Sequence, residues 1–161
     1  MPVPTSAQFH TYASIHEQVA EAVAGLTSAQ LQMVPTSGAW SIQQVLIHLA
    51  DSEVVGYERL RRIIAEDHPL LHPYDEDAWG RNLHYHQQDP RLALELFRLL
   101  RQASAALLQQ LSPETWERVG LHTENGEMSL YAAFQTYLNH GLTHLHQIEK
   151  TRSQLSSTDT H

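Results

Sequence analysis

The residues of this chain whose types and spacing best suit chemistry are two histidines in its C-terminal third. His140 and His144 lie four positions apart in a segment with helical periodicity, so their imidazoles would project from one face of a helix, one turn apart. This spacing lets both rings bind one metal ion. With 12 histidines in 161 residues, about one such pair is expected by chance. A second pair, His68 and His72, straddles Pro69, where a helix cannot be assumed.

A third histidine has a comparable position. His48 is the one histidine of segment 42–66, and it falls at the edge of the apolar stripe of that segment, as His140 and His144 do in theirs. Three neutral imidazoles with open positions describe a catalytic metal site, and zinc, nickel, iron or cobalt would all accept nitrogen ligands. The alternative is that His48 is a partly buried histidine with an ordinary hydrogen-bond partner.

Two polar residues near these histidines are candidates for supporting roles. Glu53 falls near the middle of the apolar stripe of segment 42–66. A buried carboxylate is costly unless paired, so we expect an arginine, a tyrosine or a backbone amide as its partner, and a structural role is favoured over that of a general base. Gln147 follows His144 on the same side of its helix, where it either orients a metal ligand or marks a polar boundary.

Composition limits the chemistry further. The chain has no cysteine, so disulfides and thiolate metal sites are excluded, and thiol chemistry would need an external thiol. Its formal net charge is −8, and no cluster of lysines and arginines could follow a phosphate backbone, so we expect no nucleic-acid or membrane partner. No signal-peptide pattern and no membrane-spanning apolar run is present. The sequence predicts a cytoplasmic protein with a small-molecule substrate.

Four segments with helical periodicity would have to position these residues, over residues 6–24, 42–66, 90–111 and 130–152. Ser41 with Gln44 forms a capping box for the second, and Asp89 with Pro90 starts the third. No convincing strand pattern is present, and residues 114–119 read as a short helix ended by Gly120. The sequence therefore predicts an all-α four-helix bundle, as one domain over residues 1–152 with a frayed polar tail at 153–161.

Two features of this bundle can be predicted in more detail. The third helix should face inward with Leu92, Leu96, Leu99, Leu100, Ala103 and Leu107. Between the second and third helices lies a long connection, residues 67–88, and a connection of this length is often functional. Candidate pocket residues are Tyr74, Asp75 and Trp79 in this connection and Trp40 before the second helix. Alternatively, Trp40 staples the start of the helix and the other three close one end of the bundle.

The ordered motifs resemble those of the DinB/YfiT-like superfamily. They are Trp40-Ser41-Ile42, then His48-Leu49-Ala50-Asp51-Ser52-Glu53, then His140-x-x-x-His144-x-x-Gln147-Ile148, and together they cover nearly the whole chain. In that family one histidine of the second helix and two of the fourth bind a divalent metal. The resemblance therefore implies a metal site made of His48, His140 and His144.

The same resemblance implies a dimeric, cytosolic bacterial bundle. Branches of the family include thiol S-transferases that use bacillithiol, mycothiol or glutathione-like cofactors, a thiol-dependent isomerase and many members of unknown activity. The leading hypothesis is a metal-dependent enzyme that activates an external low-molecular-weight thiol for transfer to an electrophile. With water in place of the thiol, the same site would make a hydrolase. The third hypothesis is that the protein is a non-catalytic, stress-associated helical bundle that binds a metal.

Overall fold

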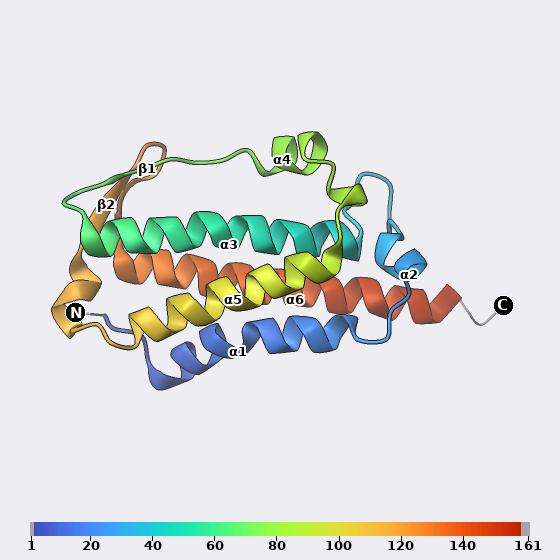
Figure 1. Cartoon of the computed structure of the whole chain (residues 1–161), viewed down its shortest axis with the longest axis horizontal. Helices are drawn as coiled ribbons and strands as arrows, with labels where there is room; N and C mark the ends of the chain where they lie inside the picture. Colours follow the sequence, from blue (N-terminus) through green and yellow to red (C-terminus); the bar gives the residue numbers. More distant parts are fainter. Residues whose placement is uncertain (1, 159–161) are drawn as a thin grey trace.

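The computed structural model describes residues 2–158, with side chains to residue 155, and four long helices dominate it. They are α1 (Ser6–Val23), α3 (Ile42–Ala65), α5 (Pro90–Leu108) and α6 (Leu130–Thr158). These helices lie side by side along the long axis of the molecule (Figure 1). α1 and α3 each pack against both α5 and α6. The predicted four-helix bundle is confirmed.

The helices begin where local sequence signals place them. Ser41 and Gln44 form the expected capping box at the start of α3, and Thr27 with Gln30 forms another at the short helix α2 (Ser28–Gln32). Asp89 caps α5, with Pro90 in its first turn. The end of α6 was predicted near residue 152, but the helix continues to Thr158. Residues 153–158 contain neither glycine nor proline, and Leu155 is buried in the core. Of the predicted tail, residues 159–161 lie outside the described part.

The bundle carries short elements, most of which the sequence did not predict. The connection contains β1 (Leu70–Leu71), α4 (Glu76–Asn82) and the 3₁₀ helix η1 (Tyr85–Gln87). Between α5 and α6 lie η2 (Pro113–Glu117), β2 (Val119–His122) and β3 (Gly126–Ser129). β2 pairs in parallel with β1 and antiparallel with β3. The expectation of no strand was therefore wrong. The short helix expected over residues 114–119 is present as the 3₁₀ helix η2, which ends at Glu117, and Val119 already belongs to β2. Strands of two to four residues are too short for alternation to reveal them.

The inward face of α5 also differs from the prediction. Leu92, Leu96 and Leu99 are 71%, 41% and 50% exposed. Of the others, Leu100 and Leu107 are half-buried, and Ala103 is exposed. The buried residues of α5 are Ala93, Phe97, Arg101, Ser104, Ala105 and Leu108. The arginine and serine make this face look polar in sequence, so a rule that turns apolar residues inward selects the wrong stripe.

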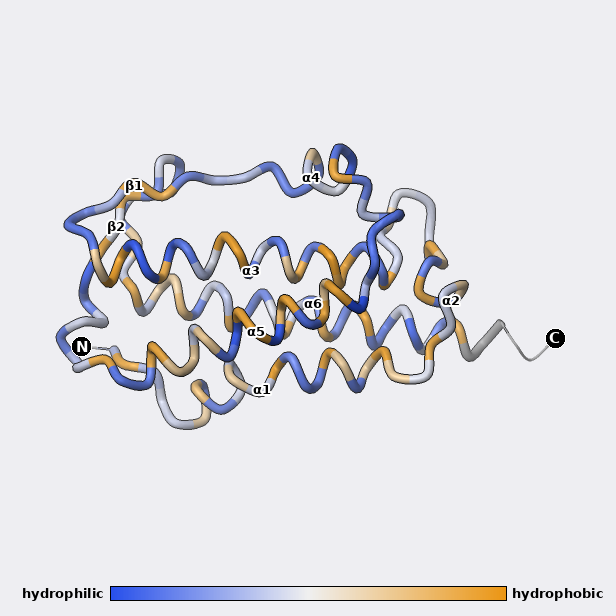
Figure 2. The backbone as a smooth tube through the Cα atoms, in the orientation of Figure 1, coloured by the Kyte–Doolittle hydropathy of each residue, from blue (hydrophilic) through white to orange (hydrophobic). Residues whose placement is uncertain are grey.

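The long connection crosses the outside of the bundle. It runs from β1 over α3 to α4 (Figure 1) and is mostly hydrophilic, whereas apolar residues recur along the bundle helices (Figure 2). Within residues 2–158, no helix combines the length and the apolar character needed to cross a lipid bilayer. The connection is thus a mostly polar segment (Figure 2) that lies over the outer side of α3 (Figure 1).

Candidate metal centre

Three imidazoles from two helices converge on one point. His48 of α3 has its Nε2 atom 2.9 Å from Nε2 of His140, which lies 3.1 Å from Nε2 of His144 on α6. An ion bound about 2.0–2.1 Å from each nitrogen would hold neighbouring nitrogens about 3.0–3.4 Å apart. Among the described residues, this is the one group of three or more histidines and carboxylates close enough to hold a metal ion. The donor atoms present fit a divalent metal.

The packing of α3 against α6 brings these rings together. His140 and His144 lie one helical turn apart on α6, and both face α3. Two turns beyond His48, Gly56 lies against the ring of Tyr137, and a Cβ atom at this position would be 2.6 Å from Cε1 of the tyrosine. The glycine thus permits the close approach of the two helices that the site requires.

The surroundings keep the three rings neutral, which is the form that binds metals. Burial, with a smaller contribution from His144, lowers the pKa of His48 to about 4. Burial, followed by the influence of the other two histidines, lowers the pKa of His140 to about 3. The pKa of His144 is also lowered by burial, although the hydrogen bond with Gln147 opposes this effect. Burial thus favours the neutral imidazole, the form that a divalent metal ion binds.

Hydrogen bonding selects the nitrogen that faces the centre. Nδ1 of His144 lies 2.8 Å from Oε1 of Gln147. An amide oxygen only accepts, so Nδ1 carries the proton and Nε2 presents its lone pair to the centre. Gln147 thus occupies the position expected of a residue that orients a ligand. Nδ1 of His48 is buried without a hydrogen-bond partner among the described residues, a costly state that points to a reason other than stability for keeping this ring.

One residue near the centre was not foreseen. Glu76, the first residue of α4, places Oε2 3.7 Å from Nε2 of His48, and its side chain is 61% exposed. It stands between Asp75 and Asp77 in the polar connection, where no periodicity distinguishes one carboxylate from the next. Sequence reasoning therefore had no signal with which to find it.

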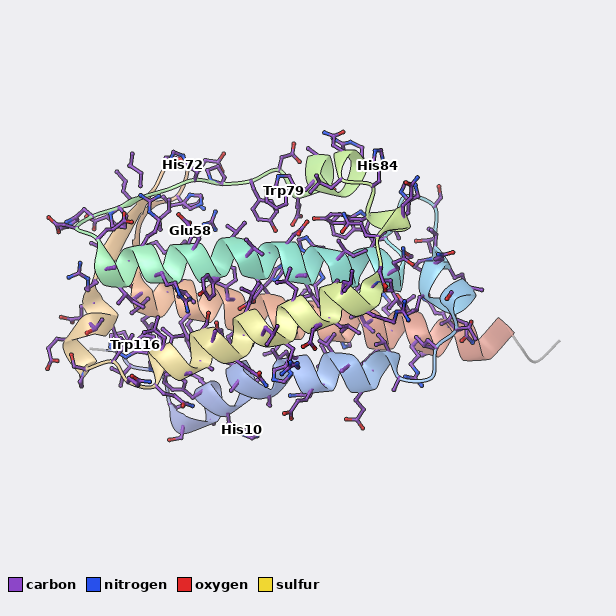
Figure 3. All side chains as sticks on the ribbon, viewed as in Figure 1. His10, Glu58, His72, Trp79, His84 and Trp116 are labelled. Atoms are coloured by element: carbon purple, nitrogen blue, oxygen red, sulfur yellow. The ribbon has the colours of Figure 1, made fainter. Side chains whose placement is uncertain are left out.

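The predicted pocket residues divide between the site and the scaffold. The ring of Trp40 lies 5.0 Å from that of His48, centroid to centroid. The rings of Tyr74 and Trp79 lie 4.8 Å apart, centroid to centroid, and are tilted by 53°, and Trp79 points from the connection toward α3 (Figure 3). Asp75 instead caps α4 by accepting a hydrogen bond from the amide of Ala78. Trp40 thus lies beside the centre, the hydroxyl of Tyr74 is bonded to Ser52, one helical turn beyond His48 on α3, and Asp75 has a structural contact.

Glu53 makes a buried ion pair and, in the described part of the chain, no hydrogen bond or ion pair with the imidazoles. Its Oε2 accepts a hydrogen bond of 2.6 Å from Nη2 of Arg101, and Oε1 accepts one of 3.4 Å from the hydroxyl of Tyr12. The partner expected for a buried carboxylate is therefore present. Among the described residues, the contacts of Glu53 are with these two side chains and not with the imidazoles. A cavity of about 640 Å³ also lies elsewhere, between α1, α2, the end of the connection and the starts of α3 and α5.

Comparison with known proteins identifies relatives along nearly the whole chain. The DinB superfamily profile matches residues 12–148. A "Putative metal-dependent hydrolase" of Oceanobacillus iheyensis is 36% identical over 126 residues, which are 78% of this chain and 73% of the relative. The "Putative metal-dependent hydrolase YfiT" of Bacillus subtilis is 33% identical over 129 residues, 80% of this chain and 72% of the relative.

Solved structures show the same fold. The structure of YfiT from Bacillus subtilis, described as "a probable metal-dependent hydrolase with an unusual four-helix bundle topology", superposes with a TM-score of 0.88 at 26% identity, covering 97% of this chain and 93% of that one. A mycothiol-dependent maleylpyruvate isomerase superposes with a TM-score of 0.67 at 12% identity, covering 89% and 60%. The second likeness concerns the fold alone.

Proposed function

Because the chain belongs to the DinB superfamily, as the match over residues 12–148 establishes, we propose that it is a metal-dependent hydrolase whose divalent metal is held by His48, His140 and His144. The observation that carries the proposal is the convergence of the three Nε2 atoms. Nε2 of His140 lies 2.9 Å from that of His48 and 3.1 Å from that of His144. Two of its relatives carry the name "Putative metal-dependent hydrolase", and this name supports a reaction with water. The metal is zinc, nickel, iron or cobalt, the ions that suit nitrogen ligands.

Each residue of the site has a definable part in this proposal. A divalent ion in an open three-histidine site supplies Lewis acidity and lowers the pKa of a nucleophile bound beside the imidazoles. His48, His140 and His144 bind the ion, and burial keeps them neutral and ready to do so. Gln147 holds the ring of His144 in the tautomer that binds.

Aromatic residues beside the centre and in the connection support a small-molecule substrate. Trp40 packs beside His48, while the rings of Tyr74 and Trp79 pack against each other in the connection. Flat apolar surfaces of this kind exclude water and suit a small organic molecule better than a polymer. We therefore assign the site a small-molecule substrate.

A low-molecular-weight thiol is the second candidate nucleophile. The chain has no cysteine, so a thiolate at this centre could come only from outside the protein. In that case the reaction would be transfer of the thiol to an electrophile instead of hydrolysis. Both reactions need the same three imidazoles, and they differ in the nucleophile that supports turnover.

Turnover measurements test the proposal. Protein loaded with each of the four metals is assayed with ester, amide and phosphoester substrates in the absence of thiol, and with electrophiles in the presence of a thiol panel. We expect turnover that His48→Ala abolishes and that His146→Ala, an exposed histidine on α6, leaves unchanged. Turnover without thiol identifies the hydrolase, and turnover only with thiol identifies the transferase. Stoichiometric metal without turnover of any substrate would contradict an enzymatic role and favour a metal-binding bundle.

A further inference from the structure

Polar side chains of α3 hold the connection in place along much of its length. Nη2 of Arg59 donates to the carbonyl oxygen of His72. Further along, the hydroxyl of Tyr74 donates to Oγ of Ser52 at 2.9 Å. Toward the end of the connection, the hydroxyl of Tyr85 donates to Oδ2 of Asp51 at 2.7 Å, and Gln43 donates to the carbonyl oxygens of residues 85, 86 and 88. The connection is thus fastened to the helix that carries His48.

Glu76 lies between these attachment points. It is two residues beyond Tyr74 and nine before Tyr85, and its Oε2 atom is 3.7 Å from Nε2 of His48. In the described part of the chain, it supplies the one carboxylate oxygen within 4.0 Å of a nitrogen of the three imidazoles. Its neighbour Asp75 is engaged in capping α4. Glu76 is therefore the acidic residue that the connection brings to the centre.

The distance and the chemistry of this carboxylate suit a role toward the metal. Carboxylate oxygens bind zinc at about 2.0–2.2 Å, and two ligands of one ion lie about 3.0–3.4 Å apart. The observed 3.7 Å separation is only slightly longer, and a side chain that is 61% exposed has the freedom to close it. Oε2 approaches Nε2 of His48, the nitrogen that faces the centre, and not the buried Nδ1.

We propose that Glu76 is a fourth ligand, supplied by the connection, to the metal ion that His48, His140 and His144 would hold. Coordination by Glu76 would fasten α4 to the centre when the metal is bound. This inference rests on the proposed metal site of His48, His140 and His144. It adds a link between occupation of that site and the order of the connection.

Three measurements on the full chain test the inference. They are the affinity for Zn²⁺ by competition with a chromogenic chelator, the visible absorption spectrum with Co²⁺, and hydrogen exchange of residues 72–82 with and without Zn²⁺. The variants are Glu76→Gln and the matched control Asp77→Asn, which removes the same charge one residue further along α4. We expect Glu76→Gln to bind Zn²⁺ about tenfold more weakly, to change the Co²⁺ spectrum and to lose the protection that Zn²⁺ gives the connection. Asp77→Asn should behave as wild type in all three.

The outcomes separate this inference from the function on which it rests. If wild type and Glu76→Gln give the same affinity, spectrum and exchange, Glu76 is not a ligand, although the three-histidine site stands. If Glu76→Gln weakens binding while the Co²⁺ spectrum stays that of wild type, the carboxylate acts only through its charge, and the ligand role is likewise overturned. If wild type binds no metal, the proposed function fails and this inference falls with it.

Discussion

Removal of the buried carboxylate of Glu53 is the most informative perturbation of the fold. Glu53 and Arg101 are 2% and 0% exposed, and their charged groups are 2.6 Å apart. Glu53→Ala leaves the guanidinium of Arg101 buried without its counter-charge, and Nε of Arg101 already lacks a partner among the described residues. Loss of one partner of a buried ion pair costs about 3–5 kcal/mol. We expect the free energy of unfolding of Glu53→Ala, measured in urea on metal-free protein, to fall by this amount.

Two controls separate this effect from a general loss of charge. Glu58 pairs with Arg62 at 3.4 Å on the surface, with side chains 54% and 31% exposed, so Glu58→Ala should cost no more than about 1 kcal/mol. The double variant Glu53→Leu with Arg101→Met removes both charges and should be more stable than Glu53→Ala alone. If Glu53→Ala costs as little as Glu58→Ala, the buried ion pair does not stabilise the core.

Three further predictions concern acid stability, helix packing and assembly. Burial lowers the pKa of His48 to about 4, below about 6.5 in the unfolded chain. In the metal-free protein, the unfolded state therefore binds more protons than the folded state as the pH falls. The free energy of unfolding in urea should fall by about 2 kcal/mol between pH 7 and pH 5 because of His48. A free energy of unfolding that does not change over this range would contradict the burial of a neutral ring. Gly56→Ala would place Cβ 2.6 Å from Cε1 of Tyr137, so we expect a loss of about 1–3 kcal/mol, seen as a lower Tm; an unchanged Tm would show that α3 and α6 have room to spare. The homodimer stays a prediction, and the exposed leucines of α5 offer an apolar face for its interface. Leu99→Glu should therefore halve the mass measured by light scattering. A variant that is still a dimer would place the interface elsewhere.

Features that depend on neighbouring residues could be predicted from the sequence. The capping box at Ser41 needs only residues three positions apart, and it is present. The periodicity of residues 130–152 predicted a helix with an apolar stripe, and α6 buries Phe134 and Ile148 completely. The three metal ligands were predicted from their residue type, their position at the edge of an apolar stripe and the family motif. The fold brings the rings of His48, His140 and His144 together.

Features that depend on distant residues could not be predicted in the same way. Arg101 faces the core because Glu53, 48 residues earlier, neutralises it there, and nothing local to α5 reveals this partner. The position of Glu76 depends on how α3 holds the connection through contacts such as those of Tyr74 and Tyr85. β1 pairs with β2 from a segment about 50 residues away. In each case the determining interaction is tertiary, whereas the sequence patterns report local structure.

The bound metal itself gives the most direct test of the central claim. Protein without a polyhistidine tag is reconstituted with Zn²⁺, Ni²⁺, Fe²⁺ or Co²⁺, freed of excess ion and analysed by mass spectrometry for metal per chain. The site of His48, His140 and His144 predicts about one ion per chain for wild type and for the control His146→Ala, and a substoichiometric amount for His140→Ala and for His144→Ala. Wild type that retains no stoichiometric metal, or a His140→Ala variant that retains as much as wild type, would contradict the account.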